Sequence, residues 1–207
     1  MPDLFDIMYN CRAMRRLDTK EVPETDLVKL IDAANQAPSG SNMQSARWLV
    51  VRDPAVKQKL ADLNRTNVDA YVGPASTRPS SLPHQSADKR ARMLDAVQWQ
   101  KEHMHELPAL IIACFEYGEK VSGAGVLRGA GSIWPGIQNL LLAARALGLG
   151  AAPTTLALVD QDPVREALNL PETMAAICLI PVGYPLGNFG PVTRKPVEEI
   201  MRFDQWS

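Results

Sequence analysis

The sequence predicts a single α+β domain in which helices pack against a sheet of short apolar strands. Two continuous apolar runs, residues 109–115 and 175–182, have the length and composition of buried strands. Segments with apolar residues at helical spacing alternate with such strands, which is typical of a layered α+β sandwich. The 207 residues show no repeat and no credible domain boundary, so they are expected to form one domain.

The individual elements follow from apolar spacing and from the residues that start and stop helices. Pro23-Glu24 favours a helix start, and Ala37-Pro38-Ser39-Gly40 favours a turn after it. The predicted helices are, in order, a short one around residues 5–9 that ends near Arg12, then 24–37, 54–60, 87–105, 133–147 and a short helix capped by Asp162-Pro163. A further strand is predicted over residues 48–51.

The helix predicted over residues 133–147 is the most apolar in the chain, and Gly148 and Gly150 favour its end. It is expected to be buried on several sides, either in the core or in a dimer interface.

Residues 64–88 lose apolar periodicity and mix prolines and a glycine with serines. A structureless stretch of this length inside a domain is typical of a lid, a binding loop or a disordered insert. Together with the helix that follows, we expect an insert or lid at about residues 64–105. From Pro185 onward, residues 185–207 are expected to form an extended C-terminal extension.

Composition and charge exclude several classes of protein. The net charge of −1 and the pI of about 6.3 provide no bulk attraction to nucleic acid or to an anionic membrane. No apolar run approaches the roughly 20 residues that span a bilayer, and the N-terminus has no signal pattern. Cys11, Cys114 and Cys178 have neither disulfide nor zinc spacing. We therefore expect a soluble, cytoplasmic protein without a metal site, in which Cys114 and Cys178 are buried and inert.

The common catalytic signatures are missing from the chain. There is no G-x-G-x-x-G after a strand, no P-loop, no G-x-S-x-G and no H-E-x-x-H. His103 and His105 are two positions apart and cannot share a helix face. No side-chain nucleophile or metal ligand set is predicted.

What remains is a set of anion-binding groups spread along the sequence. Arg12, Arg15 and Arg16 follow the first predicted helix, and a second basic spot lies at Thr193-Arg194-Lys195-Pro196. The turn at residues 38–42 and the segment Pro153-Thr154-Thr155 offer backbone donors and short polar side chains. Each alone is typical of a solvated surface, but together they describe a site for a flat, polar ligand that carries a phosphate.

Four segments in this order resemble the flavin-dependent nitroreductase family, which includes iodotyrosine deiodinases and flavin reductases. The segments cover nearly the whole chain, and they are Cys11-Arg12-Ala13-Met14-Arg15-Arg16-Leu17 before Val22-Pro23, Ala37-Pro38-Ser39-Gly40-Ser41-Asn42-Met43-Gln44 with Trp48, the helix over 133–147 with its Gly-Leu-Gly end, and Arg194-Lys195-Pro196 before Ile200. Three departures stand out. Cys11 replaces the family's first arginine, Ala13 replaces its serine, and the usual proline before the tryptophan is missing, with Ser45-Ala46-Arg47 in between.

The resemblance implies a three-layer sandwich with a mainly antiparallel sheet, a domain-swapped homodimer and FMN contacted by both subunits. Arg12 and Arg194 would hold the phosphate and ribityl end, and Arg15 would lie at the flavin N1/C2=O edge, where a cation stabilises the reduced flavin. The cofactor-binding residues so implied are Arg12, Ala13, Met14, Arg15, Arg16, Pro38, Ser39, Gly40, Asn42, Gln44, Pro153, Thr154, Thr155 and Arg194. Residues 38–42 would come from the partner subunit, and the division of work among the three N-terminal arginines stays open.

The resemblance also implies ping-pong reduction of nitroaromatic or quinone-type acceptors through flavin N5, with NADPH or NADH as the donor. Tyr71, Arg78, His84 and Trp99 are the candidates to line the acceptor pocket, with Tyr71 and Trp99 preferred. Arg47, Arg65, Arg78 and Arg90 are equally open as selectors of a 2′-phosphate. The alternatives are a flavin-dependent dehydrogenase or dehalogenase and a flavin-binding storage or sensor protein without turnover. A nucleic-acid-binding module would require the arginines to share one exposed face.

Overall fold

A four-stranded antiparallel sheet forms the centre of the computed structural model, which describes residues 3–77, 86–120 and 130–206. Its strands run in the order β1-β2-β4-β3, so β1 lies at one edge and the short β3 at the other. The strands are β1 (Ala46–Val51), β2 (Ala109–Glu116), β3 (Gly150–Ala151) and β4 (Met174–Gly183). The three strands predicted from apolar runs are confirmed, and all pairings are antiparallel.

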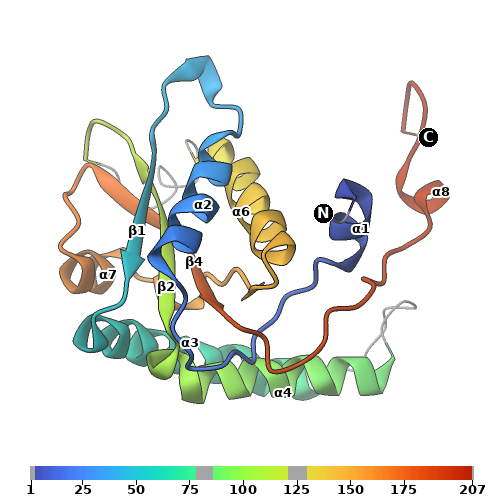
Figure 1. The fold of residues 1–207 in the computed structure, drawn as a ribbon, viewed down its shortest axis with the longest axis horizontal. Helices are drawn as coiled ribbons and strands as arrows, with labels where there is room; N and C mark the ends of the chain where they lie inside the picture. Colours follow the sequence, from blue (N-terminus) through green and yellow to red (C-terminus); the bar gives the residue numbers. More distant parts are fainter. Residues whose placement is uncertain (1–2, 78–85, 121–129, 207) are drawn as a thin grey trace.

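Helices cover both faces of this sheet, and the alternation of side chains along β2 shows how. Ile111 belongs to a core shared with α2 (Glu24–Asn35) and α6 (Trp134–Ala146). Ile112 belongs to a second core on the opposite face, shared with α3 (Pro54–Thr77) and α7 (Gln161–Leu168). Helix α4 (Ala87–His103) runs beside α3 along the bottom of Figure 1. The result is a helix–sheet–helix arrangement, as the sequence predicts.

Among the described residues, short 3₁₀ helices form part of the connections: η1 (Gly40–Asn42), η2 (Met104–Glu106), η3 (Ala130–Ser132) and η4 (Leu156–Leu158). The end of α6 is formed as predicted, because Gly148 takes a left-handed conformation with φ of 75° and the Leu149 amide donates to the Ala144 carbonyl at 2.8 Å. None of the helices in the described segments is long and apolar enough to cross a membrane.

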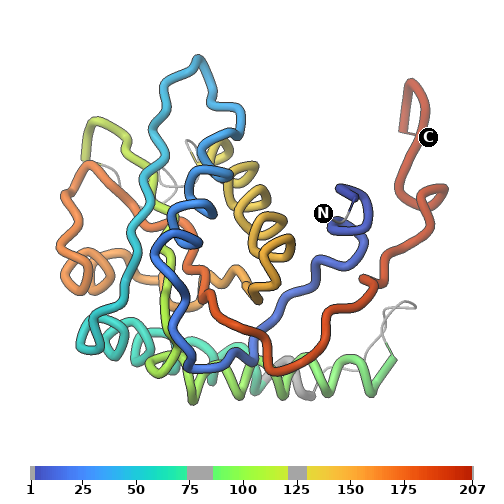
Figure 2. The backbone as a smooth tube through the Cα atoms, in the orientation of Figure 1, coloured from blue at the N-terminus to red at the C-terminus, as the bar shows by residue number. Residues whose placement is uncertain are grey.

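The two ends of the chain run side by side. Helix α1 (Leu4–Asn10) leads into an extended segment that pairs antiparallel with the chain after β4, and Figure 2 shows the two segments leaving the body of the molecule together. The Leu186 amide donates to the Arg16 carbonyl at 3.0 Å, and the Val192 amide donates to the Tyr9 carbonyl at 2.9 Å. The tail then forms the short helix α8 (Val197–Ile200). This pairing brings the N-terminal arginines next to the C-terminal extension.

Two sequence predictions are wrong. Helix α3 does not end at Leu60 but continues to Thr77, so residues 64–77 are helical rather than structureless. Leu60, Asn64 and Val68 are 0%, 2% and 1% exposed and lie one turn apart on the same buried face. Because Asn64 is polar, it interrupts the apolar pattern although its position is a core position. Arg78 and His84 lie outside the described residues.

The second error concerns the start of α7. The N-cap is Asp160, whose carboxylate accepts a hydrogen bond from the Asp162 amide at 3.1 Å. Asp162 itself lies inside the first turn of the helix, so it is not the N-cap. An N-cap residue precedes the helical residues and accepts hydrogen bonds from their amides.

Candidate functional site

The principal site is a cavity of about 300 Å³ at the β3 end of the sheet, which we call the central cavity. It is enclosed by α3, α4, the start of α6 and the chain that follows β3. Its lining residues are Arg15, Asn64, Val68, Tyr71, Met93, Val97, Gln100, Trp134, Pro153, Thr154, Thr155, Leu156 and Cys178. The structure therefore brings together Arg15, Tyr71 and the Pro153-Thr154-Thr155 segment, which the sequence analysis named separately.

A second cavity of about 530 Å³ adjoins the first, and Arg15 lines both. We call it the arginine cavity. It lies where the N-terminal segment, α4 and the chain after β4 meet, and its lining residues are Arg12, Ala13, Met14, Arg15, Arg16, Arg92, Asp95, Ala96, Trp99, Leu186, Gly187 and Asn188. The central cavity is therefore mainly apolar and the arginine cavity is cationic. The guanidinium of Arg15 lies where the two meet.

Residues 12–16, which we call the arginine segment, have their backbone held against β3 of the sheet. The Met14 amide donates to the Ala151 carbonyl at 3.0 Å, and Leu17 is 1% exposed. Gly150 makes this approach possible, because a Cβ at that position would lie 2.6 Å from Leu17 Cδ2 and 2.9 Å from Met14 Cβ. Met14 and Leu17 are therefore buried, and Arg15 and Arg16 between them face the cavities.

Arg15 is the most constrained of the three arginines. Its side chain is half-buried, and burial lowers the pKa of its guanidinium, an effect that the phenol of Tyr71 partly opposes. In the described part of the chain no carboxylate forms an ion pair with Arg15. A desolvated cation without a partner is a favourable site for an anionic or electron-rich ligand atom.

Arg12 and Arg16 have different surroundings. The Arg16 guanidinium forms an ion pair with the Asp95 carboxylate on α4. Arg12 is exposed beside Gly190, where a Cβ would lie 3.6 Å from its Nη1 atom. Among the described residues Arg12 has no ion-pair partner, so it is the better placed of the two to hold a phosphate.

The Pro153-Thr154-Thr155 segment is anchored to β4. The amides and carbonyls of Thr154 and Leu179 exchange hydrogen bonds at 2.8 and 2.9 Å. The Thr154 hydroxyl accepts from the Leu156 amide at 3.3 Å, which turns the chain into η4. This places Thr155 at an exposed bend on the rim of the central cavity.

The predicted loop at residues 38–44 lies at a separate cavity of about 280 Å³, which we call the loop cavity. Pro38, Ser39, Asn42 and Gln44 line it together with the start of α6, while Gly40 is held by a hydrogen bond from its amide to Ser132 Oγ at 3.2 Å. Ser41, Asn42 and Gln44 have φ between 51° and 53°, and such backbone strain is common at functional sites. Within one chain, this loop is not part of the central cavity.

The remaining predicted residues are distributed as follows. Arg194 is exposed on the tail, where its guanidinium donates to the Thr193 carbonyl at 2.9 Å, and it lines none of these cavities. Trp99 lines the arginine cavity and stacks on His103 with ring centroids 4.4 Å apart. Cys114 and Cys178 are buried as expected, and burial raises the pKa of both thiols to about 12.

Sequence reasoning missed two buried polar residues of the central cavity, Asn64 on α3 and Gln100 on α4. A usable signal existed, because each is a polar residue at a core position of a helix.

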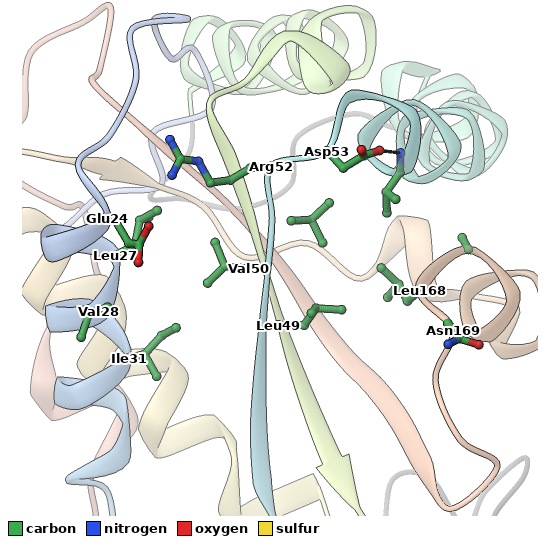
Figure 3. Close-up of a pocket in the computed structure, with 13 residues that line it drawn as sticks. Glu24, Leu27, Val28, Ile31, Leu49, Val50, Arg52, Asp53, Leu168 and Asn169 are labelled. Carbon is green, nitrogen blue, oxygen red and sulfur yellow. Dashed lines mark hydrogen bonds between the residues drawn. The ribbon is translucent and has the colours of Figure 1, made fainter.

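Sequence reasoning also missed a larger cavity of about 660 Å³ along the outer edge of β1. Figure 3 shows that Val28 and Ile31 of α2 flank this edge on one side and Leu168 of α7 on the other. We call it the edge groove.

Fold and cavities together define a helix–sheet–helix protein in which two adjoining cavities share the side chain of Arg15. The family model described as the Nitroreductase family matches residues 10–184. The chain therefore belongs to the Nitroreductase family, as its resemblance indicated.

Characterised relatives match over most of their length. The chain is 28% identical over 185 residues to the iodotyrosine deiodinase of Thermotoga neapolitana, covering 89% of this chain and 90% of that protein. It is 29% identical over 191 residues to the NADH dehydrogenase of Thermus thermophilus, covering 92% and 90%. Among solved structures, an oxidized iodotyrosine deiodinase bound to FMN and 3-iodo-L-tyrosine matches with a TM-score of 0.75 and 26% identity over 99% of this chain and 100% of that one. Such relatives support an oxidoreductase.

Proposed function

We propose that this protein is an FMN-dependent NAD(P)H oxidoreductase that reduces nitroaromatic or quinone-type acceptors. The observation that carries the proposal is the position of Arg15, a half-buried cation at the junction of the central and arginine cavities. FMN has the matching form, with a flat ring at one end and a phosphate at the other. The family and an FMN-bound structure of a deiodinase support the same cofactor.

The residues present fit this cofactor. Arg12 would hold the phosphate, and Arg15 would face the edge of the ring where reduction adds negative charge. The backbone of Thr154 and Thr155 would approach the ring from the side of the sheet. When bound, FMN would supply the redox chemistry, because its N5 atom can take up a hydride from NADH or NADPH and then deliver it to an acceptor.

The lining of the central cavity favours a planar acceptor that carries no positive charge. Its described residues include one cation, Arg15, and apolar or aromatic groups such as Met93 and Trp134, but no carboxylate. An amino-acid substrate such as an iodotyrosine carries an ammonium group, which would find no carboxylate there. The deiodinase relatives nevertheless make reductive dehalogenation the second candidate function.

We further propose that the protein acts as a domain-swapped homodimer. Exposed apolar side chains gather on α1 and on the tail, and they are Leu4, Phe5, Met8, Tyr9, Val197, Ile200, Met201, Phe203 and Trp206. Phe203 is 81% and Trp206 73% exposed, which is unusual for an isolated soluble chain. A dimer interface would cover these residues.

The edge groove offers a place for the partner's tail. β1 pairs only with β2 among the described residues, so its outer edge is free to pair with another extended segment. The groove is lined by apolar side chains from α2, β1 and α7 (Figure 3). We propose that residues 201–206 of the second copy occupy it, and that the dimer brings the partner's loop at residues 38–44 to the central cavity.

A visible spectrum and an anaerobic titration test the proposed function. The purified protein should carry a flavin absorbance that NADH or NADPH bleaches and that a nitroaromatic or a quinone restores. A flavin that is bound but not bleached by either nucleotide would favour a storage or sensor protein. Restoration by 3-iodo-L-tyrosine, and not by nitroaromatics or quinones, would favour the dehalogenase.

A further inference from the structure

The central cavity must give the acceptor a proton in addition to the hydride that the proposed reaction transfers. A quinone that becomes a quinol gains two electrons and two protons, and a hydride carries both electrons and one of these protons. The flavin would not bring the second proton, because the cation of Arg15 disfavours protonation of the ring edge beside it. The second proton must therefore come from a side chain or from water.

Two side chains in the described lining of the central cavity are of the types that act as general acids, Tyr71 and Cys178. The other lining residues are apolar, amide or hydroxyl side chains and Arg15, whose guanidinium does not give up its proton. Cys178 is 0% exposed, and burial raises the pKa of its thiol to about 12. Its thiol also donates to the Thr154 carbonyl at 3.7 Å. Tyr71 is therefore the remaining candidate for the proton donor.

Tyr71 has the surroundings that a proton donor needs. It follows Val68 by one turn of α3, which places it on the face of the helix that lines the cavity. Its side chain is 46% exposed, so the phenol is open both to a ligand in the cavity and to water. It also lies close enough to Arg15 for the two groups to interact electrostatically. A phenolate left at Tyr71 would therefore lie near a guanidinium of opposite charge, which stabilises it.

We propose that Tyr71 is the general acid that protonates the acceptor. As a quinone takes up the hydride, the Oη–H bond of Tyr71 breaks and its proton bonds to the quinone oxygen that gains negative charge. The electron pair of that bond stays on the phenolate oxygen, and water then returns a proton to Tyr71. This inference rests on the proposed function, and it adds a catalytic role to the acceptor contact that the sequence predicts for Tyr71.

The two half-reactions of the FMN-loaded protein, followed separately, test this role. Tyr71→Phe keeps the ring and removes only the hydroxyl group. Anaerobic bleaching by NADH or NADPH transfers a hydride without a proton, so its rate should equal that of the wild type. Reoxidation by saturating 1,4-naphthoquinone should be slowed about a hundredfold, as expected for the loss of a general acid. Ferricyanide accepts electrons but no proton, so it should reoxidise both proteins at the same rate.

Binding of the quinone to the oxidised protein gives a readout that does not depend on turnover. The Kd, measured from the change in flavin absorbance, should differ less than about threefold between wild type and Tyr71→Phe, because one exposed hydrogen bond between neutral groups adds little affinity. Tyr184→Phe is the matched control. Tyr184 lines neither the central nor the arginine cavity, and Lys20 Nζ lies 4.6 Å from the centroid of its ring. This variant should behave as the wild type in every measurement.

The outcomes separate this inference from the proposed function. A wild-type flavin that neither nucleotide bleaches, or that the quinone does not reoxidise, would overturn both. If the quinone reoxidises wild type and Tyr71→Phe at the same rate, the inference alone is wrong and water supplies the proton. An equal loss of rate with ferricyanide would show that Tyr71 positions the flavin. A weaker Kd with an unchanged limiting rate would show that Tyr71 only contacts the acceptor, and either result would overturn its role as an acid.

Discussion

The Arg16 guanidinium and the Asp95 carboxylate form an ion pair that joins the N-terminal segment to α4 at the arginine cavity. The side chains are 45% and 67% exposed. An ion pair as exposed as this adds little to the free energy of unfolding. It nevertheless neutralises the charge of Arg16. Of the three arginines, Arg12 and Arg15 are left to bind an anion.

The first prediction follows from this division. Arg12→Ala should weaken FMN binding about tenfold, since a charge-assisted bond to phosphate is lost, whereas Arg16→Ala should weaken it less than about threefold. Titration of the apoprotein with FMN at two salt concentrations measures both effects. Equal losses in the two variants would show that Arg16 leaves Asp95 to bind the cofactor.

The charge at Arg15 should set the reduction potential of the bound flavin. Arg15→Met removes the cation from the ring edge, so the potential should become about 30–60 mV more negative, as the loss of a charged hydrogen bond implies for a two-electron couple. Arg15→Lys should lie between the two. Equilibration with a reference dye measures the potential, and an unchanged value in Arg15→Met would place Arg15 away from the ring.

Gly150 should be intolerant of any side chain. Its Cβ would overlap Leu17 Cδ2 and Met14 Cβ, so Gly150→Ala must displace the arginine segment. We expect a loss of about 1–3 kcal/mol in the free energy of unfolding and a weaker affinity for FMN. Gly131→Ala is the control, because a Cβ there meets no atom within 4 Å. Similar behaviour of the two variants in denaturant titrations would contradict the close packing.

The buried thiols predict how stability changes in alkali. Burial raises the pKa of Cys114 and Cys178 from 9.0 to about 12, so both are protonated in the folded protein when the unfolded chain has already lost these protons. Their contribution is therefore complete below pH 9 and is lost as the pH rises toward 12, at about 1.4 kcal/mol per pH unit for each thiol. Cys114→Ala should flatten this slope in urea titrations between pH 9 and 11. A slope identical to that of the wild type would contradict it.

The tail should hold the dimer together. Phe203→Ser with Trp206→Ser removes the largest exposed apolar side chains of residues 201–206 and should convert the dimer to monomer at micromolar concentration. Gln205→Ser, in the same segment, is the control and should leave the dimer intact. Light scattering after size-exclusion chromatography measures the mass. A wild-type monomer would overturn the proposed dimer, and a dimer that survives the double substitution would place the interface elsewhere.

The fold could be predicted well because its strands and most of its helices bury continuous apolar patterns. The prediction failed in α3, where Asn64 takes a core position between Leu60 and Val68. A polar residue at such a position looks like the end of a helix when only the sequence is known. The failure therefore fell at a residue of the central cavity, where local rules are often broken for function.

The candidate site was predicted only in part, because tertiary packing decides which of its residues meet. Arg15 and the Pro153-Thr154-Thr155 segment were named separately from the sequence, and they meet at one cavity. The partner of Arg16 could not be foreseen, because Asp95 is one of many exposed acids and only the packing of α4 selects it. The loop at residues 38–44 lies at its own cavity within one chain, so its role depends on a second copy.

The antiparallel pairing of the N-terminal segment with the chain after β4 has a consequence for the order of folding. Residues 186–188 complete the arginine cavity, and they are held there by the hydrogen bond from the Leu186 amide to the Arg16 carbonyl. The cavity therefore exists only after residues 12–16 have met residues 186–188, about 170 positions away. Contacts between such distant positions form late in folding. A variant cut before residue 186 would keep all four strands of the sheet but would lack one wall of the arginine cavity, so anion binding there would be lost while the sheet still forms.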